Sequence, residues 1–419
     1  MSASHARGSS RVGSGMLRDR RLLALLLAET ISTTGTQMTW LALPWFVLIT
    51  TGSAGKMTLV LAAEAVGLVL LALPAGSALE RIGSRRMMMV SDAARLPLTL
   101  AVPVLHWTDL LSFPLLLALV FAVGAFTGPY FAAQRTIVPD LVGEDERVVG
   151  KANAFLQSAT RVTLLLGPAL AGFLIAWFGA PSVLVIDAAT YAVSVVLVGV
   201  FVRQRNESKP TAVERTRFLD GLRFVLRDPL LRGWSIAFTA GDAAWTACFA
   251  AVPVLVVAEY DADPRIAGWI FAAFGVGAVL GNAAAYRLQD RVDGLLIVAT
   301  LTLGQALPLW VFAFHVPAAT LVGAMLVSGV FNGLVNPSLH TLITLRPPRA
   351  MRARVMSARN AISMLSSPLG LVFAGPVLST AGAHPVLVGF AAVQTGAMAL
   401  ASVVSLRELS RPVLGLRSP

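Results

Sequence analysis

The chain has 419 residues, of which 56% are hydrophobic and only 13% are charged. Soluble globular proteins carry about 25% charged residues, so this composition excludes a soluble protein and indicates a membrane protein. The formal net charge of +11 does not indicate nucleic-acid binding, because the arginines are dispersed in short loops. The one cysteine, Cys248, lies in an apolar run and can form neither a disulfide framework nor a cysteine metal site.

Apolar runs follow one another along almost the whole chain. A spanning helix needs about 20 mostly apolar residues, and the first run continues without a small-residue cleavage pattern, so we interpret it as a retained helix. The sequence therefore predicts an all-α membrane protein with twelve transmembrane helices in two pseudo-symmetric six-helix bundles. The expected spans are 22–48, 57–79, 87–107, 112–133, 152–178, 182–202, 232–258, 266–287, 294–315, 318–345, 354–380 and 385–406.

Basic residues are distributed unevenly between the two sides of these spans. If the N-terminus is inside, nearly all Lys and Arg residues fall in the inner loops and tails. The outer loops hold only Lys56 and Arg265, and Arg95 and Arg161 fall within helices. By the positive-inside rule, this imbalance predicts that both termini are cytoplasmic in a multi-pass protein of the cell membrane.

One connection is longer than the others and divides the helices six and six. It predicts an N-terminal bundle over 1–202, a cytoplasmic linker over 203–231 and a C-terminal bundle over 232–419. Within the linker, apolar residues between Phe218 and Leu226 recur at the spacing of one helical face, which predicts an interfacial helix closed by Pro229. The halves resemble repeats, since Gly35 precedes Pro44 in the first helix and Gly241 precedes Pro253 in the seventh.

The connection after the second run is very short and carries glycines, an acid and three arginines. A reversal over so few residues needs glycine, because a left-handed or closely approached backbone excludes a Cβ. Its residues are Gly76, Glu80, Arg81, Gly83, Arg85 and Arg86. This spacing resembles the loop signature of the major facilitator superfamily of transporters, between the second and third helices. The one departure is Glu80, where the family more often has aspartate.

A second motif narrows the resemblance to exporters. The fifth run contains Gly167, Pro168 and Gly172, which resemble the glycine-proline motif of exporters in this superfamily. Glycines let a neighbouring helix approach, and proline bends the helix. Three further stretches, 138–142, 184–188 and 221–232, resemble the enterobactin-exporter and macrolide-efflux branch. The fourth run lacks the arginine that proton-coupled members often carry there.

Ionisable residues inside a membrane are costly and are candidates for function. Glu29, Arg161 and Asp242 fall deep in the first, fifth and seventh runs, and Glu64 lies within the second. The resemblance implies that the first, fifth and seventh helices line a central cavity, so one carboxylate is expected to exchange a proton as substrate leaves. The alternative is a fixed ion pair that only holds helices together.

Three other groups of polar or aromatic residues are interpreted from position alone. Asp92 and Arg95, three residues apart near the inner end of the third helix, are expected to pair and to form a conformational latch with the loop arginines. Asp187 is expected in the first turns of the sixth helix, where the helix dipole favours a carboxylate. His106, His315 and His384 are expected to lie at the membrane interface and have no metal-ligand spacing. Trp40 and Trp245 are the preferred candidates for contact with the substrate.

The pattern as a whole predicts a monomeric exporter of a hydrophobic or amphiphilic small molecule, driven by proton antiport and needing no cofactor, metal or nucleic acid. Alternating access by rocking of the two bundles is the expected mechanism. A facilitator or importer of a small polar nutrient remains an alternative, although it would require more polar groups than Gln37, Gln157, Asn332 and Asn336. A membrane enzyme or receptor is disfavoured, because no outer loop pairs a nucleophile with a base.

Overall fold

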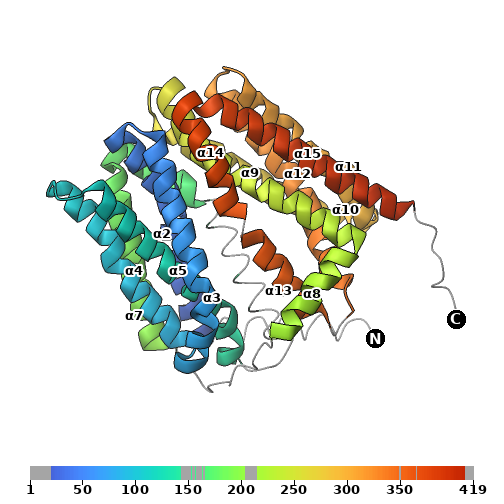
Figure 1. Ribbon diagram of the computed structural model, residues 1–419, viewed down its shortest axis with the longest axis horizontal. Coiled ribbons are helices and arrows are strands. Elements are labelled where there is room, and N and C mark those ends of the chain that lie inside the picture. The colour runs from blue at the N-terminus through green and yellow to red at the C-terminus, as the bar shows by residue number, and fades with distance from the viewer. Residues whose placement is uncertain are drawn as a thin grey trace. The chain divides into compact units, whose positions relative to one another are not determined.

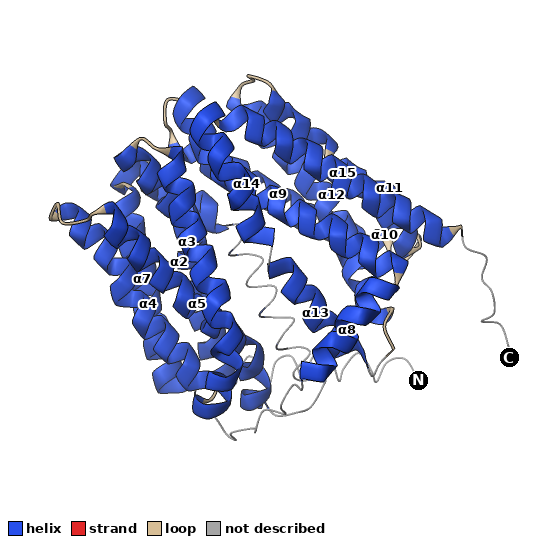
Figure 2. Cartoon of the chain, viewed as in Figure 1, coloured by secondary structure: helices blue, strands red, loops and turns tan. Residues whose placement is uncertain are grey.

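The computed structural model describes residues 20–142, 152, 156, 163, 166–202, 215–348, 351–364 and 366–410. Within these ranges the chain is almost entirely helical and contains no strand (Figure 2). Ten described segments are long and apolar enough to cross a membrane. Together with α2 (Arg20–Thr51) and the shorter apolar helix Leu166–Phe178, they make up the twelve spans expected from the sequence.

The chain divides into two compact units. One comprises Met1–Gly52 with Leu59–Thr211, and the other comprises Ser53–Thr58 with Ala212–Pro419. The break between Thr211 and Ala212 falls inside the linker expected over 203–231. The first unit contains α2, most of α3 (Ala54–Ile82), α4 (Ser84–Trp107), α5 (Phe113–Val142) and α7 (Ala180–Phe201).

The second unit begins with the linker helix α8 (Arg215–Arg227), which forms where the amphipathic pattern predicts it. The remaining elements are α9 (Pro229–Glu259), α10 (Pro264–Leu288), α11 (Gly294–Leu301), the 3₁₀ segments η1 (Thr302–Gln305) and η2 (Leu307–Ala313), α12 (Ala318–Leu345), α13 (Arg352–Met364), α14 (Ser366–Ala381) and α15 (Ala383–Leu409).

The two units repeat the same helix pairings (Figure 1). In the first unit α2 packs along α7, and in the second α9 packs along α15, so the first helix of each half lies against its last. Glycines bring the second and fourth helices of each half into backbone contact. A Cβ added to Gly124 would lie 2.1 Å from the Glu64 carbonyl oxygen, and one added to Gly281 would lie 2.0 Å from that of Val330. Small residues permit this approach in membrane helix pairs.

Among the described residues, one span differs from the uninterrupted helix that hydropathy predicts. The run 294–315 consists of α11 followed by η1 and η2, because Pro308 lacks an N–H and its ring would clash with the carbonyl of Gly304 in an α-helix. Hydropathy gives the length of an apolar run and does not register such interruptions.

Arg346 ties together three helix ends in the second unit. Its Nε donates to Asp228 Oδ2 at 2.6 Å, and a terminal nitrogen donates to Glu408 Oε1 at 2.8 Å. Asp228 also caps α9 by accepting from the backbone N–H groups of Leu230 and Leu231. Burial alone would lower the pKa of Arg346, but its hydrogen bonds to the two carboxylates raise the pKa overall, so the guanidinium stays charged.

We expect Arg346→Met to lower the free energy of unfolding by about 1–3 kcal/mol, because two charged acceptors lose their donor while remaining partly buried. Thermal unfolding of the purified protein in detergent measures the change. Arg407→Met is the matched control, because Arg407 is exposed on the last turn of α15. Equal melting temperatures for the two variants would contradict the proposed role of Arg346.

Candidate functional site

The link between α3 and α4 is a single residue. Gly83 adopts φ 78° and ψ 158°, a conformation that excludes most L-residues, and this explains the glycine. Two residues later, Arg85 donates to the carbonyl oxygens of Val198 at 3.3 Å and Gly199 at 2.5 Å. These carbonyls lie in the last turn of α7, where the helix dipole favours a cation.

The other residues of this motif have less defined surroundings. Arg81 and Arg86 are exposed. Gly76 lies within α3, and the Glu80 side chain lies outside the described part of the chain. In the described residues the motif therefore joins α4 to the end of α7, and Arg85 makes that connection.

A buried guanidinium occupies the middle of α4. Arg95 is only 1% exposed and forms an ion pair with Asp92, which is equally buried. Tyr130 of α5 and Tyr191 of α7 cover the guanidinium from two sides, each ring centroid 4.4 Å from the Arg95 Cζ. The pair expected from the sequence is present, but it lies roughly 12–17 Å along α4. Our placement of it near the helix end was wrong, because α4 begins at Ser84 rather than at residue 87.

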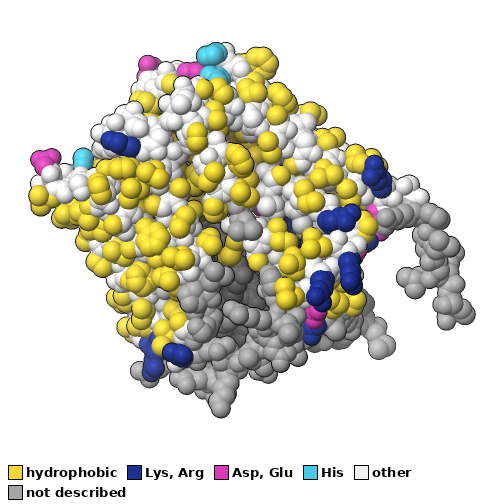
Figure 3. Space-filling model, in the orientation of Figure 1, with side chains coloured by type: hydrophobic (Ala, Val, Ile, Leu, Met, Phe, Trp, Pro, Cys, Tyr) yellow, Lys and Arg dark blue, Asp and Glu magenta, His cyan; other side chains and the backbone are white. Residues whose placement is uncertain are grey.

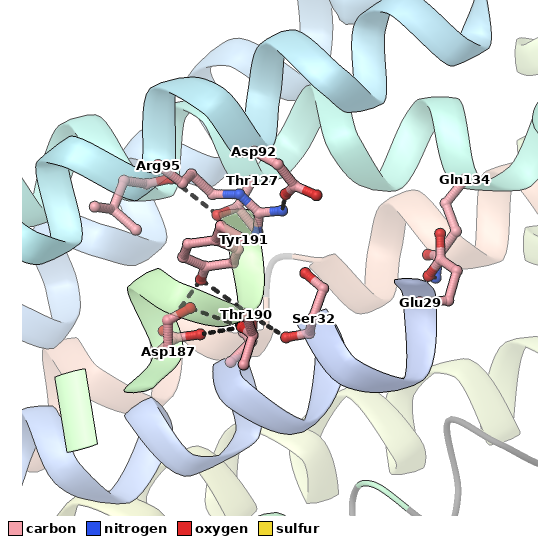
Figure 4. A network of polar contacts seen from close by, with 11 residues as sticks. Glu29, Ser32, Asp92, Arg95, Thr127, Gln134, Asp187, Thr190 and Tyr191 are labelled. Atoms are coloured by element: carbon pink, nitrogen blue, oxygen red, sulfur yellow. Dashed lines mark hydrogen bonds and ion pairs between the residues drawn. The ribbon is translucent and has the colours of Figure 1, made fainter. Parts of the chain in front are cut away.

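Asp187 is the centre of the hydrogen bonds that link α7 to α2. Its carboxylate accepts from Thr39 Oγ1 at 2.6 Å. It also accepts from the Tyr191 hydroxyl at 3.2 Å (Figure 4). It has no exposed surface. Our helix-dipole interpretation of Asp187 was wrong, because α7 begins at Ala180 and the dipole effect fades within the first turn.

Gly35 of α2 makes room for this cluster. A Cβ at Gly35 would lie 2.4 Å from Thr190 Oγ1 and 2.5 Å from Asp187 Oδ1. In the second unit the corresponding glycine faces an uncharged side chain, because a Cβ at Gly241 would lie 3.0 Å from the amide oxygen Oε1 of Gln394. The first helix of each half therefore presents a glycine to a polar side chain of the last helix.

Glu29 lies apart from this cluster, toward the start of α2 (Figure 4). It is 3% exposed, and its Oε2 accepts from the Gln134 side-chain amide of α5. Its other oxygen, Oε1, is buried and has no hydrogen-bond partner within the described residues. Arg95 lies within electrostatic range of Glu29, but no salt bridge to Glu29 forms in the described part of the chain, so this carboxyl group is less compensated than Asp92 and Asp187.

The helices of the first unit place four carboxyl groups near one guanidinium. Glu64 of α3 is half-buried and lies within electrostatic range of Asp187 and Arg95. Glu29, Asp92 and Asp187 complete the set, and Arg95 is its cation. Such an excess of acidic groups at membrane depth is typical of proton-exchanging sites.

The remaining members of the expected cavity group are not brought together here. Arg161 lies outside the described residues. Asp242 belongs to the second unit, where it is exposed, accepts a hydrogen bond from Ser363 Oγ at 3.2 Å and lies within electrostatic range of Arg359. Sequence reasoning missed Arg359, because it lies in a segment that was expected to begin a plain apolar helix.

The second unit also contains an apolar groove of about 680 Å³. Its floor is α9 around Ala243, and its walls come from α14 and α15, including Phe373, Gly389 and Phe390. Trp245 packs against Phe390 with ring centroids 5.2 Å apart, so it adjoins the groove without lining it. Trp40 belongs to the first unit and is half exposed.

Gly167 of the helix Leu166–Phe178 lies close to α2. A Cβ there would lie 2.4 Å from the Gln37 Cβ on α2. Pro168 and Gly172 lie on the same helix, Leu166–Phe178, and are buried. The sequence predicted only that His315 and His384 lie at the membrane interface. In the structure both side chains also contact Glu259.

Comparison with known proteins decides the family. A family model described as transmembrane secretion effector, within the major facilitator superfamily, matches residues 15–413. The chain belongs to this family of major facilitator transporters. It is an integral, multi-pass membrane protein that transports small molecules, as the loop motif led us to expect.

Its relatives include named efflux pumps. The multidrug efflux pump Tap of Mycolicibacterium fortuitum is 28% identical over 378 residues, covering 87% of this chain and 90% of that protein. Tap of Mycobacterium tuberculosis is 28% identical over 399 residues, covering 92% and 94%. Among solved structures, a bacterial homologue of the lysosomal transporter Spinster in an inward-facing state has a TM-score of 0.70 at 13% identity, covering 94% and 98%. This last likeness shows the fold alone.

We expect Arg95→Met to lower the free energy of unfolding by about 3–5 kcal/mol, because it leaves the buried Asp92 carboxylate without its cation. The double variant Asp92→Asn with Arg95→Met should recover much of this loss, since both charges are then gone. Denaturation of the purified protein in detergent measures both. Additive losses in the double variant would show that the two side chains do not act as a pair.

Proposed function

We propose that this transporter exports hydrophobic or amphiphilic small molecules of the drug or antibiotic kind from the cell in exchange for protons. Both termini then lie in the cytoplasm of a cell-membrane protein, which the distribution of Lys and Arg supports. The names of the Tap relatives support drug export. The helix-5 motif supports the outward direction, and alternating access of the two units is the expected route.

Proton coupling rests on one observation, the incompletely compensated carboxyl group of Glu29. A buried, unpaired carboxylate is unfavourable in a medium of low polarity, whereas the neutral acid needs only modest hydrogen bonding. Glu29 has one amide donor and an oxygen without a partner in the described chain. A group held this way changes its protonation when water or substrate reaches it, which is the requirement for coupling.

We therefore assign proton coupling first to Glu29. Glu64 and Asp242 are further candidates for the same role. Arg95 keeps a fixed positive charge close by, through its pair with Asp92 and its two tyrosine neighbours. Asp187 is held by hydrogen-bond donors from α2 and α7, so it serves to orient the helices. Asp92 and Arg95 act in the same way, as a fixed centre rather than a moving latch.

We expect Glu29→Gln to abolish export driven by the proton gradient while leaving the protein folded, because Gln fills the same space without a titratable proton. Efflux of a panel of antibiotics from cells measures this, with and without a protonophore. Asp109→Asn is the matched control, since Asp109 is exposed after α4 at a φ of 57° that Asn tolerates. Export that persists in Glu29→Gln, or after collapse of the gradient, would contradict antiport through this residue.

The substrate class rests on the apolar groove of the second unit. Small-molecule sites are concave and mostly apolar, with volumes of about 300–1,000 Å³, and the groove falls in this range. Two of the polar residues that a nutrient importer would offer, Asn332 and Asn336, are bonded to other amide groups instead. Asn332 donates to Gln305 Oε1 at 3.0 Å, and Asn336 donates to Asn332 Oδ1 at 2.7 Å. The contrast favours an apolar substrate over a polar nutrient.

We expect Gly389→Leu to reduce export of the bulkier apolar compounds by about tenfold or more, since loss of one to two kcal/mol of binding has that effect. A Cβ at Gly389 meets nothing within 4 Å, so leucine enters the groove without a clash. The control is Gly396→Leu on the same helix, because Gly396 is equally open and does not line the groove. Equal export by both variants would show that substrates do not use this groove.

The loop after α3 is proposed to govern the conformational change. Arg85 fixes α4 to the end of α7, and Gly83 allows the abrupt turn that places it there. Glu80 and the arginines then hold the cytoplasmic helix ends together in the outward-open state and release them in the inward-open state. The protein is expected to do this as a monomer.

A further inference from the structure

Three metal-ligand side chains meet at one end of the second unit. They are Glu259 at the end of α9, His315 between η2 and α12, and His384 in the first turn of α15. Their donor atoms all lie within 4.8 Å of one another. Glu259 Oε1 is 3.2 Å from His315 Nε2 and 2.5 Å from His384 Nε2. Figure 3 shows histidine and acidic side chains at this end and basic side chains around α8 at the other.

Three features of the second unit hold these donors in place. The Tyr260 hydroxyl donates to the Val316 carbonyl oxygen at 2.6 Å, which ties the end of α9 to the loop carrying His315. Gly382, with φ 80°, turns the chain directly into α15, so that His384 is fixed in the first turn. The packing of α9 along α15 brings Glu259 to His384.

We propose that Glu259, His315 and His384 form a binding site for a divalent transition-metal ion of the zinc type. Two imidazoles and one carboxylate are the protein ligands of open zinc sites, whose fourth position is taken by water or another ligand. With metal–ligand bonds of about 2.0–2.1 Å in a tetrahedral arrangement, the donor atoms are roughly 3.3 Å apart. The His315–Glu259 separation already has this value. The His384–Glu259 separation of 2.5 Å, and the His315–His384 separation of at most 4.8 Å, reach it if the side chains rotate.

The surroundings suit an ion that enters from the aqueous side. Glu259 and His384 are 21% and 23% exposed, whereas His315 is 78% exposed, so the cluster has one closed side and one open side. His384 Nε2, the ring nitrogen that faces Glu259, is the donor that this residue offers to an ion here. The open side leaves the fourth coordination position to solvent.

A hydrogen-bonded cluster that only staples three helix ends is the competing explanation. The variant Glu259→Gln distinguishes a metal site from a hydrogen-bonded cluster. Glutamine keeps an oxygen that accepts hydrogen bonds from the imidazoles, but it is not an anionic metal ligand. Hydrogen bonds between the helix ends would persist in this variant, whereas metal binding requires the carboxylate. His315→Ala is the second variant, since its exposed side chain can be removed with little disturbance of packing.

The experiment is calorimetric titration of the full-length protein in detergent with Zn²⁺ alone. We expect about one equivalent to bind to the wild type, and Glu259→Gln and His315→Ala each to bind at least about tenfold more weakly, a loss comparable with those seen on weakening zinc sites. His106→Ala is the control, because His106 lies in the first unit against Phe46 and outside the cluster. It should bind Zn²⁺ as the wild type does.

A spectroscopic readout makes the assignment independent of affinity. X-ray absorption at the zinc edge should report nitrogen and oxygen ligands at about 2.0–2.1 Å in the wild type, and loss of the imidazole signal in His315→Ala. Wild-type protein that binds Zn²⁺ no more tightly than Glu259→Gln would overturn the proposal. An equal loss in His106→Ala would also overturn it, by showing that the ion binds surface histidines without selection.

Discussion

The first unit is organised by the cost of placing the Arg95 guanidinium in the membrane. An ion at this depth is tolerated only where partners replace water. Asp92 supplies the counter-charge, and Tyr130 and Tyr191 supply the aromatic faces. These partners come from α4, α5 and α7, and Asp187 extends the same set of contacts to α2. The positions of four helices are therefore set by the requirement to surround one charge.

The second unit has no buried ion pair in the described parts of its membrane-spanning helices. Its interior polar contacts are between amides and hydroxyls, as at Gln305, Asn332 and Asn336, and its ion pairs lie at the helix ends around Arg346 and Glu259. The two halves thus share helix pairings and glycine contacts but differ in electrostatics. This difference supports the proposal that Glu29 of the first unit exchanges the proton and that the apolar groove of the second unit holds the substrate.

Sequence reasoning predicted the helices well and the partners poorly. Apolar length and arginine distribution gave the number of spans, and the short loop motif gave the need for glycine at position 83. Asp187 was misjudged because its importance comes from Thr39 and Tyr191, which lie elsewhere in the chain or on the next turn. The cluster of Glu259, His315 and His384 was missed for the same reason, since ligands spread over three helix ends leave no local spacing to recognise.

The 3₁₀ segments after α11 have a consequence for how this protein fits its bilayer. A 3₁₀-helix rises about 2.0 Å per residue against 1.5 Å for an α-helix. The span Gly294–Ala313 has only 20 residues, and eleven of them belong to η1 and η2. At those rises the span measures about 36 Å rather than 30 Å, against a hydrocarbon thickness of about 30 Å. The 3₁₀ segments therefore add about one α-helical turn of length, so 20 residues reach a distance here for which an α-helix would need about 24.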